Sequence, residues 1–127
     1  MANPETVIKN EILLELGCRP DVYIQNQPTG TFRAWDDPRR PVKVGNPGQS
    51  DLLAVVAVTI TPDMVGQTVG LAWFPEVKTA KGKQRETQQL FQLAVERRGA
   101  RYDLVRSPAE AVAILEAIKR GEVRRGF

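Results

Sequence analysis

The sequence predicts a single α/β domain in which helices flank a central mixed β-sheet. The chain has 127 residues, which is room for one hydrophobic core over residues 1–127. Apolar residues make up 42% of it, as is usual for folded proteins. Helical and strand-like patterns follow each other in the order α–(β)–β–β–α–β–α. A helix between two strands favours a right-handed crossover and a mixed sheet whose faces are covered.

The N-terminal part is predicted to contain one helix and then short strands joined by turns. Asn3 suits a helix cap and Pro4 a first helical turn, and residues 4–16 repeat apolar side chains at helical spacing. Gly17 is the expected end of this helix. Short strands are expected at 22–24 and 31–35, with turns at 36–41 and 45–48.

The C-terminal part is predicted to hold three strands and two helices. Residues 52–60 are apolar and β-branched without alternation, which is typical of a strand buried on both faces. A second strand at 69–78 is expected to pair with it as a hairpin. Ser107 and Glu110 suit a capping box at the start of the last helix. The remaining elements are a helix at 84–98, a strand at 101–105 and a helix from 108 to about 120.

Composition excludes several kinds of site. The chain has one cysteine and no histidine, so an internal disulfide, a Cys/His nucleophile and a His-rich zinc site are excluded. No apolar run approaches the roughly 20 residues that span a bilayer, and the N-terminus has no signal or transit pattern. We expect a cytoplasmic protein with no membrane partner and no organic cofactor. The net charge of +3 fits a polyanionic partner.

Glu76, Val77 and Lys78 form the most informative triplet. Alternate side chains of a strand point to one face, so Glu76 and Lys78 share a face at the end of the strand predicted at 69–78. Burying charges at the end of an apolar strand is costly unless they have partners or a task. Alone, an acidic residue two positions before a lysine is more typical of an ordinary surface strand.

Asp51 strengthens the functional interpretation because it stands at the start of the preceding predicted strand. In a hairpin the start of the first strand lies beside the end of the second, so Asp51 and Glu76 would converge. Two close carboxylates repel each other unless a cation lies between them. Mg²⁺ prefers oxygen ligands and keeps several waters, and the carbonyl of Val77 would be a further ligand.

Two more residues have both a structural and a functional interpretation. Glu5 lies on the apolar stripe of the first predicted helix and would bring a third carboxylate. An acidic residue in a first helical turn also interacts favourably with the helix dipole, which is the simpler explanation of Glu5 alone. Gln88 lies on the inner face of the helix at 84–98. It would either bond to the backbone there or orient a water or a phosphate.

Two groups of basic side chains are candidates for phosphate contacts, which position a duplex without reading its bases. The first group follows the Glu76 strand and consists of Lys81, Lys83 and Arg85. The second group precedes Asp51 and consists of Arg33, Arg39 and Arg40. A solvated face explains the first group equally well.

Together these motifs resemble a known family. The G-x-x-D, E-x-K and G-x₅-Q motifs of the VRR-NUC (virus-type replication-repair nuclease) domain, within the PD-(D/E)xK nuclease superfamily, are similar to Gly48–Asp51, Glu76–Lys78, and Gly82 with Gln88. Stand-alone phage members also resemble the chain at Glu5 with Ile8, at Arg19–Asp21 and at 107–112. The resemblance covers nearly the whole chain. It departs from the family at Pro75, where members carry an aliphatic residue, and proline removes a hydrogen-bond donor from the strand.

The resemblance implies a restriction-endonuclease-like core and a phage- or prophage-encoded endonuclease that hydrolyses phosphodiester bonds. Stand-alone members are homodimers that act on branched DNA such as four-way (Holliday) junctions. By motif position, Glu5, Asp51 and Glu76 would bind Mg²⁺, for which Mn²⁺ would substitute. Lys78 would help to activate the attacking water, and Gln88 would complete the site.

Two alternatives stay open. One is a non-catalytic nucleic-acid-binding or scaffold protein on the same fold, although a pure binder gains nothing from carboxylates that face phosphate. The other is a nuclease for RNA or flapped DNA, or one with sequence preference. No base-reading module is visible in the sequence, which favours recognition of DNA shape.

Overall fold

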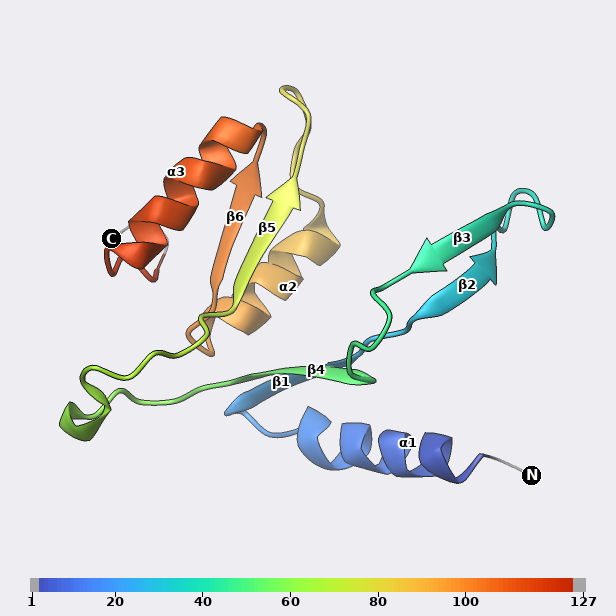
Figure 1. The fold of residues 1–127 in the computed structure, drawn as a ribbon, viewed down its shortest axis with the longest axis horizontal. Coiled ribbons are helices and arrows are strands. Elements are labelled where there is room, and N and C mark those ends of the chain that lie inside the picture. The colour runs from blue at the N-terminus through green and yellow to red at the C-terminus, as the bar shows by residue number, and fades with distance from the viewer. Residues whose placement is uncertain (1–2, 125–127) are drawn as a thin grey trace. The chain divides into compact units, whose positions relative to one another are not determined.

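The computed structural model describes residues 3–124, and the chain divides into two compact units, residues 1–54 and 55–127. The described residues form a mixed α/β fold with three α-helices and three two-stranded sheets (Figure 1), in agreement with the predicted α/β class. Across residues 3–124, every helix is too short or too polar to cross a membrane.

The first unit begins with α1 (Pro4–Gly17), which has the predicted cap. The Asn3 side chain accepts a hydrogen bond from the Glu5 N–H at 2.8 Å, and Pro4 occupies the first turn, where its missing N–H costs nothing. The helix packs against strand β1 (Val22–Asn26). Helix α1 therefore belongs to the first unit, and its first turn carries Glu5.

Strand β1 pairs with β4 (Leu52–Val56) in one of the two-stranded sheets. The Gln27 N–H, directly after β1, donates to the carbonyl of Asp51, directly before β4, at 2.8 Å. The end of one strand therefore lies beside the start of the other, which is the antiparallel arrangement. The connection between these two points contains the second sheet of the unit.

That second sheet is a hairpin of β2 (Gly30–Arg33) and β3 (Pro41–Val44), paired antiparallel with Phe32 opposite Val42. Strand β3 was not predicted, because the prolines of residues 36–41 indicated a turn. Pro41 is tolerated because it is the first residue of its strand. At the hairpin base Gly45 has φ +71°, and a Cβ there would lie 2.9 Å from the Pro28 carbonyl oxygen, so glycine is required.

The second unit is built on a β–α–β arrangement. Strands β5 (Trp73–Val77) and β6 (Arg101–Val105) pair in parallel, with Glu76 opposite Leu104, and α2 (Glu86–Glu96) connects them. Val95 of α2 is fully buried, and Phe91 meets Phe74 and Tyr102 edge-on, with ring centroids 5.1 and 6.1 Å apart. The small core therefore lies between α2 and the two strands, as the apolar face of that helix predicts.

Helix α3 (Pro108–Lys119) completes the unit and contacts β6. Half of the predicted capping box is present: the Ser107 hydroxyl oxygen accepts from the Glu110 N–H at 3.1 Å. The Glu110 carboxylate in turn accepts from the Arg106 N–H at 2.7 Å, one residue before the position that a standard capping box uses.

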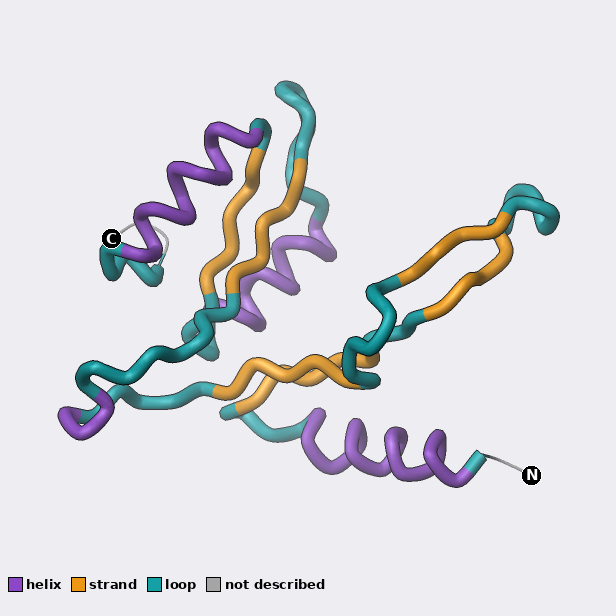
Figure 2. The backbone as a smooth tube through the Cα atoms, in the orientation of Figure 1, coloured by secondary structure: helices purple, strands orange, loops and turns teal. Residues whose placement is uncertain are grey.

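Two expectations about residues 52–60 and 69–78 were wrong. Within residues 3–124, β4 pairs with β1 and β5 pairs with β6, so the expected hairpin between these two segments is not formed. Residues 57–72 are mostly loop, with one 3-10 turn, η1 (Pro62–Met64), as Figure 2 shows. Burial of residues 52–60 on both faces is also contradicted, because Val56, Val58 and Ile60 are 57%, 63% and 68% exposed. An apolar run predicts burial, but among the described residues β4 has a strand partner on one side only and ends at Val56.

Candidate functional site

Glu76 and Lys78 lie together at the carboxyl end of β5. The Lys78 Nζ is 3.6 Å from Glu76 Oε1, and their side chains are 12% and 31% exposed. The Lys78 N–H donates to the Val105 carbonyl at 3.0 Å, which continues the β5–β6 pairing one residue beyond the strand. This pairing keeps the side-chain alternation, so both charged groups point to the same face, as the sequence predicts.

Gln88 joins the start of α2 to the same carboxylate. Its Nε2 donates to Glu76 Oε1 at 2.5 Å, and its Oε1 accepts from the Arg85 N–H at 2.9 Å. The amide therefore caps the helix, as the structural interpretation predicts, and it also contacts Glu76; the orientation of a water or a phosphate by Gln88 stays a prediction. Lys78 and Gln88 engage the same oxygen of Glu76, and within residues 3–124 no hydrogen bond or ion pair engages Oε2.

The chain turns tightly after Lys78, with Gly82 at the inside of the turn. The Gly82 N–H donates to the Thr79 carbonyl at 3.0 Å, and the Gly82 carbonyl accepts from Arg106 Nη2 at 3.0 Å. A Cβ on Gly82 would lie 3.2 Å from Thr79 Oγ1 and 3.4 Å from Lys78 Cβ. The absence of a side chain at Gly82 therefore lets the turn pack directly against Lys78.

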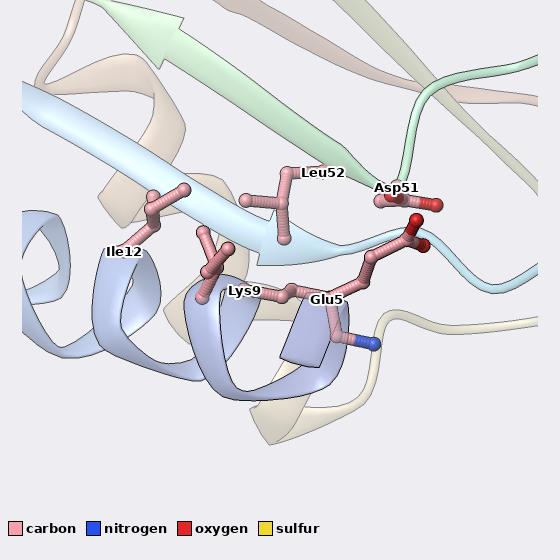
Figure 3. Close-up of a pocket in the computed structure, with 6 residues that line it drawn as sticks. Glu5, Lys9, Ile12, Asp51 and Leu52 are labelled. Atoms are coloured by element: carbon pink, nitrogen blue, oxygen red, sulfur yellow. The ribbon is translucent and has the colours of Figure 1, made fainter. Parts of the chain in front are cut away.

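Glu5 and Asp51 line one pocket of about 200 Å³ in the first unit, shown in Figure 3. Glu5 extends from the first turn of α1 toward Asp51, which precedes β4. Apolar side chains of α1 and β4 and one lysine form the rest of the lining: Ile8, Ile12, Leu52 and Lys9. Glu5 shares the pocket with Ile8 and Ile12, as their common helical stripe predicts.

The predicted metal ligands fall into two groups, one in each unit. Glu5 and Asp51 belong to the first, and Glu76 with the Val77 carbonyl belongs to the second. Among residues 3–124, no group of three or more His, Cys, Asp or Glu side chains is arranged to hold a metal. The chemistry of the donor set nevertheless fits Mg²⁺, because all the candidate ligands are hard oxygens.

The two groups of basic residues differ in their surroundings. Lys81, Lys83 and Arg85 are exposed, on the segment between the Lys78 turn and α2. In the β2–β3 loop, Arg40 pairs with Asp36 at 2.7 Å and Arg39 pairs with Asp37 at 3.3 Å. Arg33 donates to the Pro38 carbonyl at 2.8 Å. Part of the positive charge of the second group is therefore balanced within its own loop.

One buried polar cluster was missed. Arg101 and Asp103 on β6 form an ion pair with Arg101 Nε 2.8 Å from Asp103 Oδ2, and both residues are under 9% exposed. The Trp73 indole N–H donates to the same oxygen at 3.0 Å, and Arg101 Nη1 donates to the Glu122 carbonyl. The signal was present, since Arg101 and Asp103 stand two positions apart on a strand, like Glu76 and Lys78.

The second unit thus holds a half-buried carboxylate with two donors on one of its oxygens, next to a tight turn and exposed lysines. The first unit holds two carboxylates around one pocket. A half-buried carboxylate can bind a cation or accept a proton, and a half-buried ammonium can stabilise negative charge that develops on a phosphate. Comparisons of the chain with models of protein families, with curated proteins and with solved structures found no match.

Proposed function

We propose that this chain is a Mg²⁺-dependent endonuclease that hydrolyses phosphodiester bonds in branched DNA, such as four-way junctions. The observation that carries the proposal is the contact of Lys78 and Gln88 with a single oxygen of Glu76 at the end of β5. A strand end seldom holds a half-buried acid and lysine unless they have a structural or chemical task. The G-x-x-D, E-x-K and G-x₅-Q motifs favour the chemical task.

The proposed metal ligands are Asp51, Glu76, Glu5 and the carbonyl of Val77. Oε2 of Glu76 is the oxygen available to an ion, because Lys78 and Gln88 hold Oε1. Mg²⁺ keeps several waters and accepts few protein ligands, so a small number of carboxylates is sufficient. When bound, the ion would lower the pKa of a coordinated water and neutralise charge on phosphate oxygens. Mn²⁺ would substitute for it.

Each protein group has a distinct task in the proposed hydrolysis. Lys78 would position the attacking water or stabilise the negative charge that grows on the phosphate. Gln88 would keep Glu76 oriented while it binds the cation. The exposed residues Lys81, Lys83 and Arg85 would contact phosphates along the duplex and hold it in register.

The architecture proposed for this activity is a restriction-endonuclease-like core. The order α1, β1, β4, β5, α2, β6 contains a pair of strands followed by a parallel β–α–β arrangement, and this order of elements supports the proposal. A homodimer is part of the proposal, because a four-way junction offers symmetric strands to two copies. We also propose that the protein acts in a reducing compartment, such as the cytoplasm of a phage host, since the chain has a single cysteine.

The proposal is tested by cleavage of end-labelled four-way junctions in Mg²⁺ or Mn²⁺. Lys78→Ala and Asp51→Asn are expected to lower the single-turnover rate by about 100-fold or more. Lys119→Ala, an exposed lysine on α3, is the matched control and should cleave like the unsubstituted protein. Full activity in either Lys78→Ala or Asp51→Asn would contradict the assignment. Calorimetry with Mn²⁺ measures metal binding independently of cleavage, and Glu76→Gln should weaken it.

One observation supports a non-catalytic alternative. Glu76 is already partnered by Lys78 and Gln88, so its charge is balanced without a metal. A nucleic-acid-binding protein with the same fold could use this cluster only to hold β5 and α2 together. Binding of branched DNA that is unchanged by Mg²⁺, without cleavage of branched, flapped or linear substrates, would favour this alternative.

A further inference from the structure

The tip of the β2–β3 hairpin carries an aromatic side chain that is almost entirely in solvent. Trp35 is 97% exposed, more than any other large hydrophobic residue among residues 3–124, and Phe32 on the same hairpin is 48% exposed. A tryptophan gains free energy from burial and is enriched where binding energy is concentrated. An indole held in water at a loop tip is therefore a candidate contact for a ligand.

The loop around Trp35 is held by specific contacts. Ala34, just before it, is buried, and its N–H donates to the Arg40 carbonyl at 3.0 Å. Asp36, just after it, is paired with Arg40 at 2.7 Å. Trp35 therefore stands between two anchored residues, so its backbone loses little conformational entropy when the side chain meets a partner.

The hairpin is also basic on one face. Residues opposite each other in an antiparallel pair share a face, so Thr31 with Lys43 and Arg33 with Pro41 lie on one side. Residues 30–44 contain four basic and two acidic side chains, so the hairpin is net positive. This charge fits a polyanion. An isolated two-stranded hairpin is marginally stable in water, so a bound partner would also stabilise it.

The segments that enter and leave the hairpin are joined at its base by hydrogen bonds from Gln27 to Asp51 and Ser50. The Gln27 N–H donates to the Asp51 carbonyl at 2.8 Å, and Gln27 Nε2 donates to the Ser50 carbonyl at 3.3 Å. Eight residues lead from Gln27 to Trp35, so at ~3.3 Å per residue the tip lies within roughly 26 Å of this base. At ~3.4 Å per nucleotide along one strand, that is the length of about eight nucleotides.

We propose that the β2–β3 hairpin binds unpaired nucleotides, with Trp35 stacking on a base while basic side chains of the hairpin contact the adjoining phosphates. An aromatic platform next to positive charge is the combination that recognises single-stranded nucleic acid. The link to DNA branches rests on the proposed nuclease function. The hairpin would bind the unpaired bases at a branch, and the phosphodiester bond to be cut, near Asp51, would lie within about eight nucleotides of them. The binding itself requires no catalysis.

The test is a fluorescence titration in EDTA, so that no metal-dependent cleavage occurs. A ten-nucleotide oligo(dT) should quench the indole emission of the unsubstituted protein, and a paired duplex of the same length should quench it much less. Trp35→Ala should remove the quenching and raise the Kd, measured by anisotropy of labelled oligo(dT), by about tenfold or more. Trp73 remains in this variant, and its emission reports that the second unit is folded.

Val65→Ala is the matched control, because Val65 is 81% exposed and lies outside the hairpin. It should leave the Kd within twofold of the unsubstituted value. An equally small change in Trp35→Ala would overturn the proposal. So would sedimentation showing that Trp35→Ala converts a dimer to a monomer, because the indole would then contact a second copy of the chain.

The two proposals fail in different ways. Lys78→Ala should lose cleavage and keep the oligo(dT) quenching. A protein that cuts junctions while Trp35→Ala binds normally would contradict only the hairpin proposal. A protein that never cuts DNA but loses oligo(dT) binding in Trp35→Ala would contradict only the nuclease proposal.

Discussion

The side-chain amide of Gln88 lies 2.5 Å from the carboxylate of Glu76 and connects the end of β5 to the start of α2. The same amide accepts from the Arg85 N–H through its oxygen. One residue thereby caps a helix and orients an acidic group. Substitutions of Gln88 can separate these two tasks.

Gln88→Glu keeps an acceptor for the Arg85 N–H but replaces the donor to Glu76 with a second carboxylate. At pH 7 the two negative charges should destabilise the variant by about 1 kcal/mol, less than in a fully buried pair. Added salt screens like-charge repulsion at a partly exposed site, and the Glu76 side chain is 31% exposed. Urea unfolding at low and at high ionic strength should therefore show a smaller difference from the unsubstituted protein at high ionic strength. An equal difference at both ionic strengths would contradict this prediction.

Gly82→Ala should disturb the turn that packs on Lys78. The new Cβ would lie 3.2 Å from Thr79 Oγ1 and 3.4 Å from Lys78 Cβ, so these atoms must move by a few tenths of an ångström. We expect a loss of about 1 kcal/mol in the free energy of unfolding and, if Lys78 acts in cleavage, a several-fold lower single-turnover rate. Gly70→Ala is the control, because a Cβ there meets nothing within 4 Å. Similar effects at both glycines would show that the contact with Lys78 is unimportant.

Asp103→Ala should be strongly destabilising because it leaves Arg101 buried without its partner. Removal of one member of a buried ion pair costs about 3–5 kcal/mol, whereas apolar replacement of both members is often nearly neutral. Arg101→Met combined with Asp103→Leu should therefore be more stable than Asp103→Ala. Chemical unfolding of both variants measures the difference. A double variant less stable than Asp103→Ala would indicate that the bond from Arg101 to the Glu122 carbonyl outweighs the cost of burying an unpaired Arg101.

Ser107→Ala should cost about 1 kcal/mol, because the Glu110 N–H at the start of α3 loses its acceptor. Ser107→Asp should recover most of this loss, since aspartate is also a good cap and its charge suits the N-terminus of the helix. Thermal unfolding of the two variants checks both statements. Equal stability of Ser107→Ala and the unsubstituted protein would mean that the Glu110 N–H finds another partner.

Local features of the fold were predictable from short stretches of sequence. Strand β6 has the predicted bounds, Arg101–Val105, and Asn3 and Ser107 cap the helices that follow them, as predicted. In each case the neighbouring residues are sufficient for the prediction. Apolar and β-branched side chains indicate the strand, and a capping side chain next to the first N–H groups of a helix indicates the helix start. The shared face of Glu76 and Lys78 follows from strand alternation in the same way.

Strand pairing was not predictable from the same patterns. Residues 52–60 indicate a strand, but which partner β4 takes depends on contacts between distant segments, and the partner is β1. Strand β3 was hidden by the prolines around it, including Pro41 at its start. The bond between Gln88 and Glu76 was also out of reach, because spacing places Gln88 on the inner face of α2 but does not say which strand residue it meets.

The apolar segment that consists of β4 and the residues just after it has a consequence for the handling of the protein. Residues 52–60 contain nine consecutive uncharged residues, mostly valine, leucine, alanine and isoleucine, without proline or glycine. In the part of the chain that the structure describes, Val56, Val58 and Ile60 are exposed to solvent. Segments of this composition stack readily into intermolecular cross-β assemblies. Concentrated, shaken samples should therefore be the most prone to form fibrils, and Val58→Lys should slow this by placing a charge within the segment.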